Sequence, residues 1–104
     1  TPLYIACEKG HLECAQLLRD AGADINQAKE DGATPLFMAC QNNHPEIARL
    51  LLATDADINQ AMNDGTTPLY IASQNGHLEC AQLLRDAGAD INQADEEGTT
   101  PLSI

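Results

Sequence analysis

Histidine and cysteine have the greatest scope for chemistry in this chain, because imidazole and thiolate groups bind zinc and act as bases or nucleophiles. His11, His44 and His77 follow one another at equal intervals along the chain. Two of them precede a cysteine by three residues, in the pairs His11–Cys14 and His77–Cys80. Each pair would supply at most two of the four ligands of a structural zinc ion. We therefore expect no metal site.

A catalytic site would need a nucleophile, a base and an orienting group that converge in one pocket. The other two cysteines, Cys7 and Cys40, are separated by the same interval as the histidines, so like residues should stand in parallel rows rather than in clusters. No Ser-His-Asp arrangement and no glycine-rich phosphate-binding motif is recognisable. The sequence therefore predicts a protein that is not an enzyme and needs no cofactor.

The same interval recurs over the whole chain. Thr-Pro-Leu begins at Thr1, Thr34, Thr67 and Thr100, which defines a 33-residue period. Copies one and three match at 27 of 33 positions, and copies one and two at 18. We interpret residues 1–104 as a single array. Its copies are 1–33, 34–66 and 67–99, followed by the start of a fourth at 100–104.

Each copy predicts a pair of short helices. Thr1 and Pro2 are typical of a helix N-cap and first turn, which indicates a first helix over residues 2–9. A second helix is expected over residues 12–20, with Glu13 on the favourable side of the helix dipole. The expected apolar faces follow the helical spacing i, i+3, i+4, i+7. They are Leu3, Ala6, Cys7 and Gly10 in the first helix and Cys14, Leu17, Leu18 and Ala21 in the second.

All four cysteines fall at positions that these patterns place inside the helix pair. We expect them to behave as small buried hydrophobes with free thiols, which favours an intracellular location, cytoplasmic or nuclear. Gly10 and Gly22 should end the helices in the left-handed conformation, and the second copy has Asn43 and Asp55 at these positions. Because Asp tolerates that conformation less well than Gly, Asp55 is a predicted local weakness.

One copy is too small to bury its own apolar faces, so the copies must stack into an all-α solenoid. Thr-Pro-Leu-x-x-Ala, Gly-His before the second helix, Leu-Leu within it and Gly-Ala-Asp-Ile-Asn after it resemble the ankyrin repeat, which has the same period. The resemblance implies stacked helix-turn-helix pairs with projecting hairpin-like loops. It also implies a non-catalytic module that binds a protein partner on the concave surface of first helices and fingertips.

One position departs from the ankyrin pattern. The family usually has His after Thr-Pro-Leu, whereas this chain has Tyr4, Phe37, Tyr70 and Ser103. Phe37 cannot make the local hydrogen bond that this His makes. We expect the rings to fill space between repeats; an aromatic ladder with a function is the alternative.

The charge balance limits the class of partner. Five Lys and Arg against 16 Asp and Glu give a net charge of −11. Such a charge repels phosphate groups, which argues against binding to nucleic acid and to anionic membranes. No run of about 18 apolar residues is present, so no membrane span is expected. The composition favours a protein partner.

Within a repeat array, positions that face solvent and vary between copies are candidates for partner contact. An apolar row of Ile5, Met38 and Ile71 on the first helices is expected to face the groove in part, and acidic fingertips favour a partner with a basic rim. The predicted contact residues are Ile5, Glu8, Lys9, Lys29, Glu30, Asp31, Met38, Gln41, Asn42, Met62, Asn63, Asp64, Ile71, Gln74, Asn75, Asp95, Glu96 and Glu97.

Three alternatives remain open. The near-identity of copies one and three also fits a structural or engineered repeat scaffold with no evolved partner. Neither end shows the polar outer face that isolated arrays need, which suggests self-stacking of the uncapped ends or a segment of a longer array. Asn26, Asn59 and Asn92 are spaced like the site that an asparaginyl hydroxylase modifies in similar repeats; otherwise they satisfy backbone groups in the turn.

Overall fold

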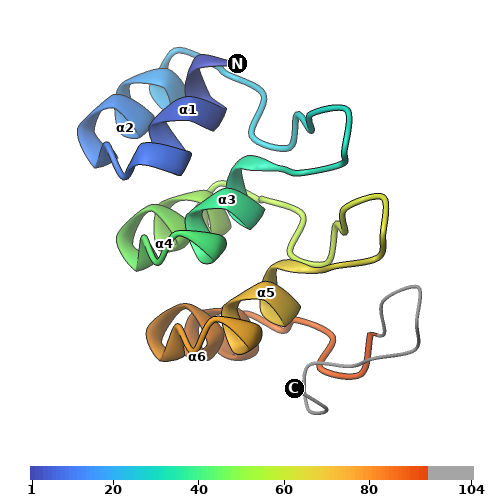
Figure 1. Cartoon of the computed structure of the whole chain (residues 1–104). Helices are drawn as coiled ribbons and strands as arrows, with labels where there is room; N and C mark the ends of the chain where they lie inside the picture. Colours follow the sequence, from blue (N-terminus) through green and yellow to red (C-terminus); the bar gives the residue numbers. More distant parts are fainter. Residues whose placement is uncertain (94–104) are drawn as a thin grey trace.

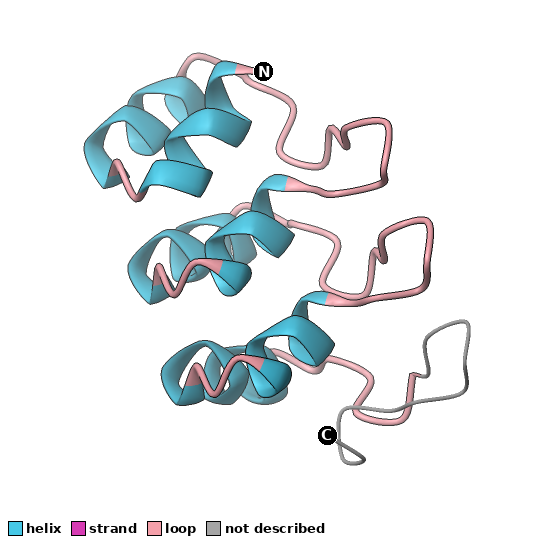
Figure 2. Cartoon of the chain, in the orientation of Figure 1, coloured by secondary structure: helices cyan, strands magenta, loops and turns pink. Residues whose placement is uncertain are grey.

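The computed structural model describes residues 1–93, and that range contains six α-helices joined by loops and no β-strand. Three helix pairs stack on one another, and the long loops project to one side (Figure 1, Figure 2). The expected all-α stack is confirmed, and the first two helices have the predicted bounds. The helices are α1 (Pro2–Lys9), α2 (Leu12–Asp20), α3 (Pro35–Gln41), α4 (Pro45–Ala53), α5 (Pro68–Gln74) and α6 (Leu78–Asp86).

The helices form two layers, with α1, α3 and α5 in one and α2, α4 and α6 in the other. Each helix packs against the other helix of its own repeat and against its equivalents in the adjacent repeats. Small side chains without exposed surface fill the space between the layers, which allows the backbones to approach closely. They are Cys7, Ala15, Ala39, Cys40, Ala48, Ala72 and Cys80. None of the described helices has the length and apolar character needed to cross a membrane.

Threonine hydroxyls cap the first helix of each repeat, as predicted. The hydroxyl oxygens of Thr1, Thr34 and Thr67 accept hydrogen bonds from the backbone N–H three residues later, at 3.1 to 3.2 Å. Thr34 and Thr67 are buried, so the hydroxyl and the orphan N–H satisfy each other where water does not reach.

The helix ends use the left-handed backbone at the predicted positions. Gly10 has φ 81°, and in the second repeat Asn43 has φ 59°. Two constraints favour glycine at position 10. The positive φ is one, and the other is space, because a Cβ there would lie 2.6 Å from the His44 ring. At the end of α4, Asp55 adopts φ 64° where the other repeats have glycine, as the sequence predicts.

The predicted apolar face of the second helices is right at the positions of Cys14 and Leu18, whose equivalents in the second and third repeats are buried, and wrong at the position of Leu17. Ile47, Ala48 and Leu51 are the buried residues of α4, so the buried sector follows the spacing i, i+1, i+4. In α2, Leu17 is 70% exposed, although it was expected to face the core. The reason is that α4 packs against α3 on one side and against α2 and α6 on the others, which moves the centre of the buried sector.

The aromatic position after Thr-Pro-Leu fills space in the core. Tyr4 and Phe37 are buried, and Tyr70 is half-buried. The ammonium nitrogen of Lys29 lies 4.8 Å from the centre of the Tyr4 ring, within range of a cation–π contact. Ser103 lies outside the described residues.

Replacing Asp55 tests the strain at the end of α4. Asp55→Gly should raise the free energy of unfolding by about 0.5 to 1 kcal/mol, because glycine adopts a positive φ without steric cost. Asp55→Ala should lower it by about 1 kcal/mol, since alanine has a Cβ but no polar side chain to compensate. Urea denaturation measures both. A loss of stability in the glycine variant would contradict the interpretation.

Candidate protein-binding surface

The fingertips are short hairpin-like turns with the same internal hydrogen bonds. In the first, the Lys29 N–H donates to the Ala33 carbonyl and the Gly32 N–H donates to the Lys29 carbonyl, both at 2.9 Å. The second repeats this pattern between residues 62 and 66. The carboxylate of Asp31 accepts from the Ala33 N–H at 3.0 Å. The fingertip backbone is therefore held in a defined shape.

One aspartate of each described fingertip belongs to this turn. Asp64 accepts from the Thr66 N–H at 2.9 Å, in the position that Asp31 occupies in the first fingertip. Hydrogen bonds from Thr66, side chain and backbone, lower the pKa of Asp64 because they stabilise the charged form. Asp31 and Asp64 thus have a structural role in their turns, and the charged form of Asp64 is stabilised by its hydrogen bonds.

Adjacent fingertips are joined to each other. The Asn63 side-chain amide donates to the Glu30 carbonyl at 2.8 Å, and its backbone N–H donates to the Asp31 carbonyl at 2.8 Å. Gly32 allows this approach, since a Cβ at Gly32 would lie 2.8 Å from the Asn63 backbone nitrogen. The first two fingertips therefore form one continuous edge.

The bases of the loops are joined in the same way by asparagines. The Asn26 side-chain oxygen accepts from the Asp57 N–H at 2.7 Å, and the Asn59 oxygen accepts from the Asp90 N–H at 2.9 Å. Each of these asparagines thus satisfies a backbone donor of the following repeat. This geometry shows the structural role expected for Asn26 and Asn59; Asn92 has no following repeat among the described residues.

At the far end of the first helices, a single carbonyl receives two side chains of the next repeat. The Glu8 carbonyl oxygen lies 3.0 Å from the Asn42 amide nitrogen and 3.2 Å from His44 Nε2. The Gln41 carbonyl receives the equivalent pair from the third repeat, at 3.3 and 3.0 Å. Because a carbonyl can only accept, Nε2 must carry the proton in each histidine. His44 and His77 are therefore links between repeats.

These contacts show what the sequence reasoning missed. Asn42, Asn63 and Asn75 were predicted as partner contacts because they vary between copies, and each donates to a carbonyl of the preceding repeat. The signal that could have revealed this is local: Asn42 and Asn75 stand two residues before the periodic histidine, which shares the same acceptor.

Most of the other predicted contact residues are accessible. Glu8, Gln41 and Met62 are half-buried. The exposed residues are Lys9, Lys29, Glu30, Asp31, Asn42, Asn63, Asp64, Gln74 and Asn75. Asp95, Glu96 and Glu97, the predicted third fingertip, lie outside the described residues.

The predicted apolar row is wrong as an accessible surface. Met38 and Ile71 are each only 8% exposed, whereas Ile5 is 54% exposed. Met38 and Ile71 are covered because α3 packs against α1 and α5 packs against α3. Ile5 has no helix pair on its outer side among the described residues. Met38 and Ile71 are therefore part of the repeat interface and not of an accessible groove.

The arginines lie away from this surface, on the second helices. Arg19 pairs with Asp20 at 2.8 Å, and Arg85 pairs with Asp86 at 2.9 Å. A third, Arg49, lies 4.0 Å from Glu79. Only the two lysines, Lys9 and Lys29, belong to the first-helix and fingertip side. That side therefore carries an acidic excess.

Three of the four thiols are buried, and the prediction for the fourth is wrong. Cys7, Cys40 and Cys80 have no exposed surface, but Cys14 is exposed because no helix pair in the described part of the chain covers α2 on that side. Burial raises the pKa of Cys7 to about 12, and a hydrogen bond with Cys80 together with burial raises that of Cys40. Among the described residues, no group of three or more His, Cys, Asp or Glu could hold a metal ion.

A family model described as ankyrin repeats, in three copies, matches residues 3–95. The chain is also 54% identical over 35 residues to a protein named "Probable E3 ubiquitin-protein ligase XBOS32" from Oryza sativa subsp. japonica. That match covers 33% of this chain and 7% of the rice protein.

The link made by His77 can be tested against its equivalent in the first repeat. His77→Ala removes the donor to the Gln41 carbonyl and should lower the free energy of unfolding by about 1 to 2 kcal/mol. His11→Ala is the matched control, because His11 has no preceding repeat to contact in the described stack, and it should change stability by less than about 0.5 kcal/mol. Equal losses in urea denaturation would show that histidine acts within its own turn.

Thiol reactivity tests the burial of the cysteines. In the native chain, Cys14 should react with a maleimide at the rate of an exposed thiol, and the three buried cysteines should react at least about 100-fold more slowly. Mass spectrometry after timed labelling identifies the modified residue. Cys14→Ser should abolish the fast phase; a remaining fast phase would refute the assignment.

Proposed function

The chain belongs to the ankyrin-repeat family, and we propose that it is a non-catalytic module that binds a protein partner on its first-helix and fingertip side. Ankyrin repeats generally mediate protein–protein interaction and are generally not enzymes. The matched segment of the rice protein is about one repeat long. The match therefore supports the ankyrin repeat in this chain, and we do not infer the ligase activity in that protein's name.

One observation carries this proposal: the fingertips are held rigid while remaining exposed. Hydrogen bonds within each turn, and those from Asn63 to the first fingertip, fix the loop that carries Glu30 and Asp31. A preorganised loop loses little conformational entropy on binding, which favours recognition of a folded or extended partner.

The charge of this side suggests the chemistry of the partner. Glu8, Glu30, Asp31 and Asp64 give it an acidic excess, and the lowered pKa of Asp64 keeps this carboxylate ionised to a lower pH than an ordinary aspartate. We propose a protein with a basic rim, because complementary charges raise the association rate and fix orientation. We place this interaction inside the cell, in the cytoplasm or nucleus, where the free thiols would stay reduced.

Charge reversal on this side should weaken partner binding. We expect Glu8→Lys combined with Glu30→Lys to raise Kd about tenfold or more, with a smaller salt dependence, because the changed groups would repel a basic rim. Neither side chain is among those that hold the fingertip turns. The partner is first identified by affinity capture with the chain, then purified and titrated by calorimetry.

The matched control carries the same charge change on the second helices. Glu13→Lys with Glu46→Lys also brings the net charge from −11 to −7, since each substitution adds two units. It should change Kd less than about twofold. Equal weakening by both variants would refute the assigned surface, and the absence of any reproducible partner would favour the scaffold alternative.

A further inference from the structure

Two fully buried thiols meet across the interface between the second and third repeats. Cys40 lies in α3 and Cys80 lies in α6, and neither side chain has exposed surface. A hydrogen bond joins the two thiols. The Cys80 sulfur also lies 3.9 Å from the side-chain oxygen of Asn43, which follows Cys40 by three residues. Both contacts place the Cys80 sulfur beside the end of α3.

This contact is close to the geometry that a disulfide requires. A hydrogen bond between thiols holds the two sulfur atoms next to each other, so a small movement suffices to reach the S–S bond length of about 2 Å. The packing of α3 against α5 and of α4 against α6 holds the two repeats in place around the pair. Both thiols are free in this structure.

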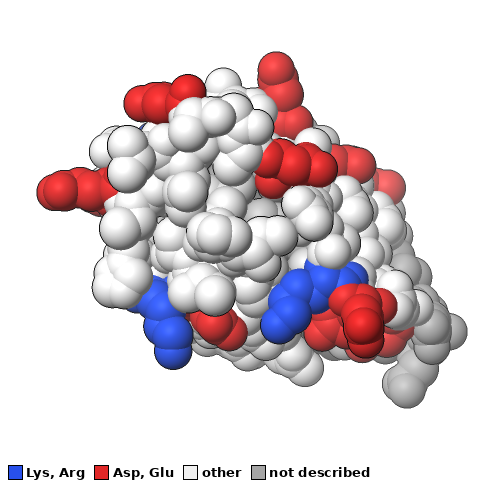
Figure 3. Space-filling view, turned by 90° about the horizontal axis from the view of Figure 1, so that it is seen from above, with Lys and Arg blue, Asp and Glu red and all other residues white. Residues whose placement is uncertain are grey.

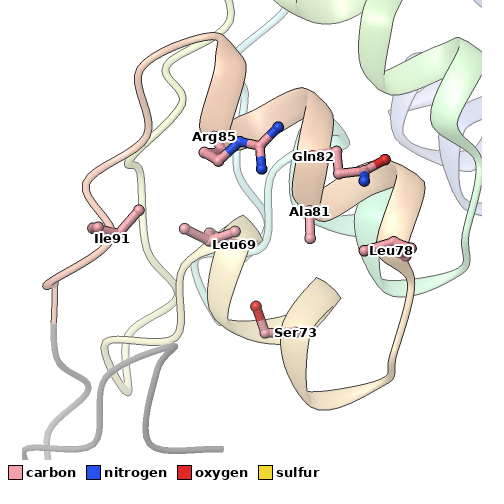
Figure 4. A pocket seen from close by; sticks show the side chains of 7 residues that line it. All are labelled: Leu69, Ser73, Leu78, Ala81, Gln82, Arg85 and Ile91. Carbon is pink, nitrogen blue, oxygen red and sulfur yellow. The ribbon is translucent and has the colours of Figure 1, made fainter.

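The pair is not repeated at the equivalent positions of the other repeats. Where the second repeat packs on the first, Cys7 takes the position of Cys40, but Ile47 takes that of Cys80. In the third repeat the position of Cys40 is occupied by Ser73, which lies on α5 beside α6 (Figure 4). Cys7 is therefore a buried thiol that faces a hydrocarbon side chain at the position where Cys40 meets Cys80.

A surface groove leads towards the pair. It has a volume of about 280 Å³, and Asn43, Ile47 and Glu79 are among the residues that line it. The Asn43 side chain, which borders this groove, supplies the oxygen next to the Cys80 sulfur. A small molecule in the groove thus reaches the amide that covers the sulfur.

The charge around the groove favours a neutral oxidant. Glu46 and Glu79 line it, and acidic groups predominate over basic ones on the face of the molecule seen in Figure 3. Together with the net charge of −11, these carboxylates repel anionic disulfides such as oxidised glutathione. Hydrogen peroxide is neutral and small, so it is the oxidant that this site admits best.

The hydrogen bond between the thiols also determines which sulfur reacts first. It lowers the pKa of Cys80, although burial and the Glu79 carboxylate act in the opposite direction, and it raises the pKa of Cys40. The thiolate is the nucleophilic form of cysteine. Cys80 therefore supplies the attacking sulfur, and Cys40 keeps its proton until the second step.

We propose that hydrogen peroxide oxidises Cys40 and Cys80 to a disulfide that joins the second and third repeats covalently. The Cys80 thiolate attacks one peroxide oxygen, the O–O bond breaks, and a sulfenic acid and hydroxide form, of which the hydroxide takes up a proton to become water. The Cys40 sulfur then attacks the Cys80 sulfur. The S–S bond forms, the S–O bond breaks, and the hydroxyl group leaves with the Cys40 proton as a second water. Two thiols are oxidised, one peroxide is reduced, and a thiol reductant reverses the change.

Trypsin allows a direct test, because it places each cysteine in a different peptide. Cleavage after Lys and Arg leaves Cys7, Cys14, Cys40 and Cys80 in peptides 1–9, 10–19, 30–49 and 50–85. The folded chain with Cys14→Ser, which removes the exposed thiol, is treated with hydrogen peroxide, and the remaining thiols are then alkylated in urea. Mass spectrometry should find peptides 30–49 and 50–85 joined in most molecules, with Cys7 alkylated.

The disulfide should also raise the thermal midpoint by at least about 5 °C, because it closes a loop in the unfolded chain. Dithiothreitol should reverse this rise. In the same background, Cys40→Ser should give neither the joined peptides nor the rise. Cys7→Ser is the matched control, since it makes the same substitution at the same position of the first repeat, and it should give both.

Three outcomes would overturn the proposal. One is that Cys40 and Cys80 are both alkylated after treatment of the folded chain. Another is that Cys7 is joined to either of them as often as they are joined to each other. The third is that peptides 30–49 and 50–85 are joined only when peroxide is added to the chain already unfolded in urea, since the repeat interface would then have no part in the reaction.

Discussion

The interface between successive repeats is the interaction on which the rest of this structure depends. A helix pair of this length cannot bury both of its sides, so each pair is completed by the next one in the stack. The residues that make this possible are small: Cys7, Cys40 and Ala48 have no exposed surface, and they let the helix layers approach closely. Stability is thus distributed over the contacts between neighbours rather than concentrated in one central core.

Polar links accompany the apolar contacts at both interfaces between the described repeats. The Glu8 and Gln41 carbonyls, near the ends of their helices, each receive an asparagine and a histidine of the next repeat. Helix ends leave carbonyls without partners inside the helix, so these side chains satisfy groups that would otherwise depend on water. The same arrangement aligns the repeats and fixes their register.

These links between repeats change how sequence variation between the copies should be interpreted. A position that varies and faces solvent can still have a structural task, as Asn63 does where it joins two fingertips. Glu30, by contrast, contributes its backbone carbonyl to that link and leaves its carboxylate on the surface. A binding surface on this scaffold therefore depends on exposed side chains that make no contact holding the repeats together.

The sequence alone determined the features that depend on near neighbours in the chain. The threonine caps, the bounds of α1 and α2 and the left-handed residues Asn43 and Asp55 follow from contacts between residues close together in the chain, which sequence spacing records directly. The ankyrin-repeat stack could also be predicted, because the 33-residue period is visible in the sequence.

Only the tertiary structure decided which apolar residues are buried. Ile5 and Ile71 are the same residue at the same position of near-identical repeats, yet one is exposed and the other is covered. Cys14 and Cys80 differ in the same way. The burial of these side chains depends on a helix pair from the preceding repeat, one full period away in the sequence, and no pattern within a single repeat can reveal whether that neighbour is present.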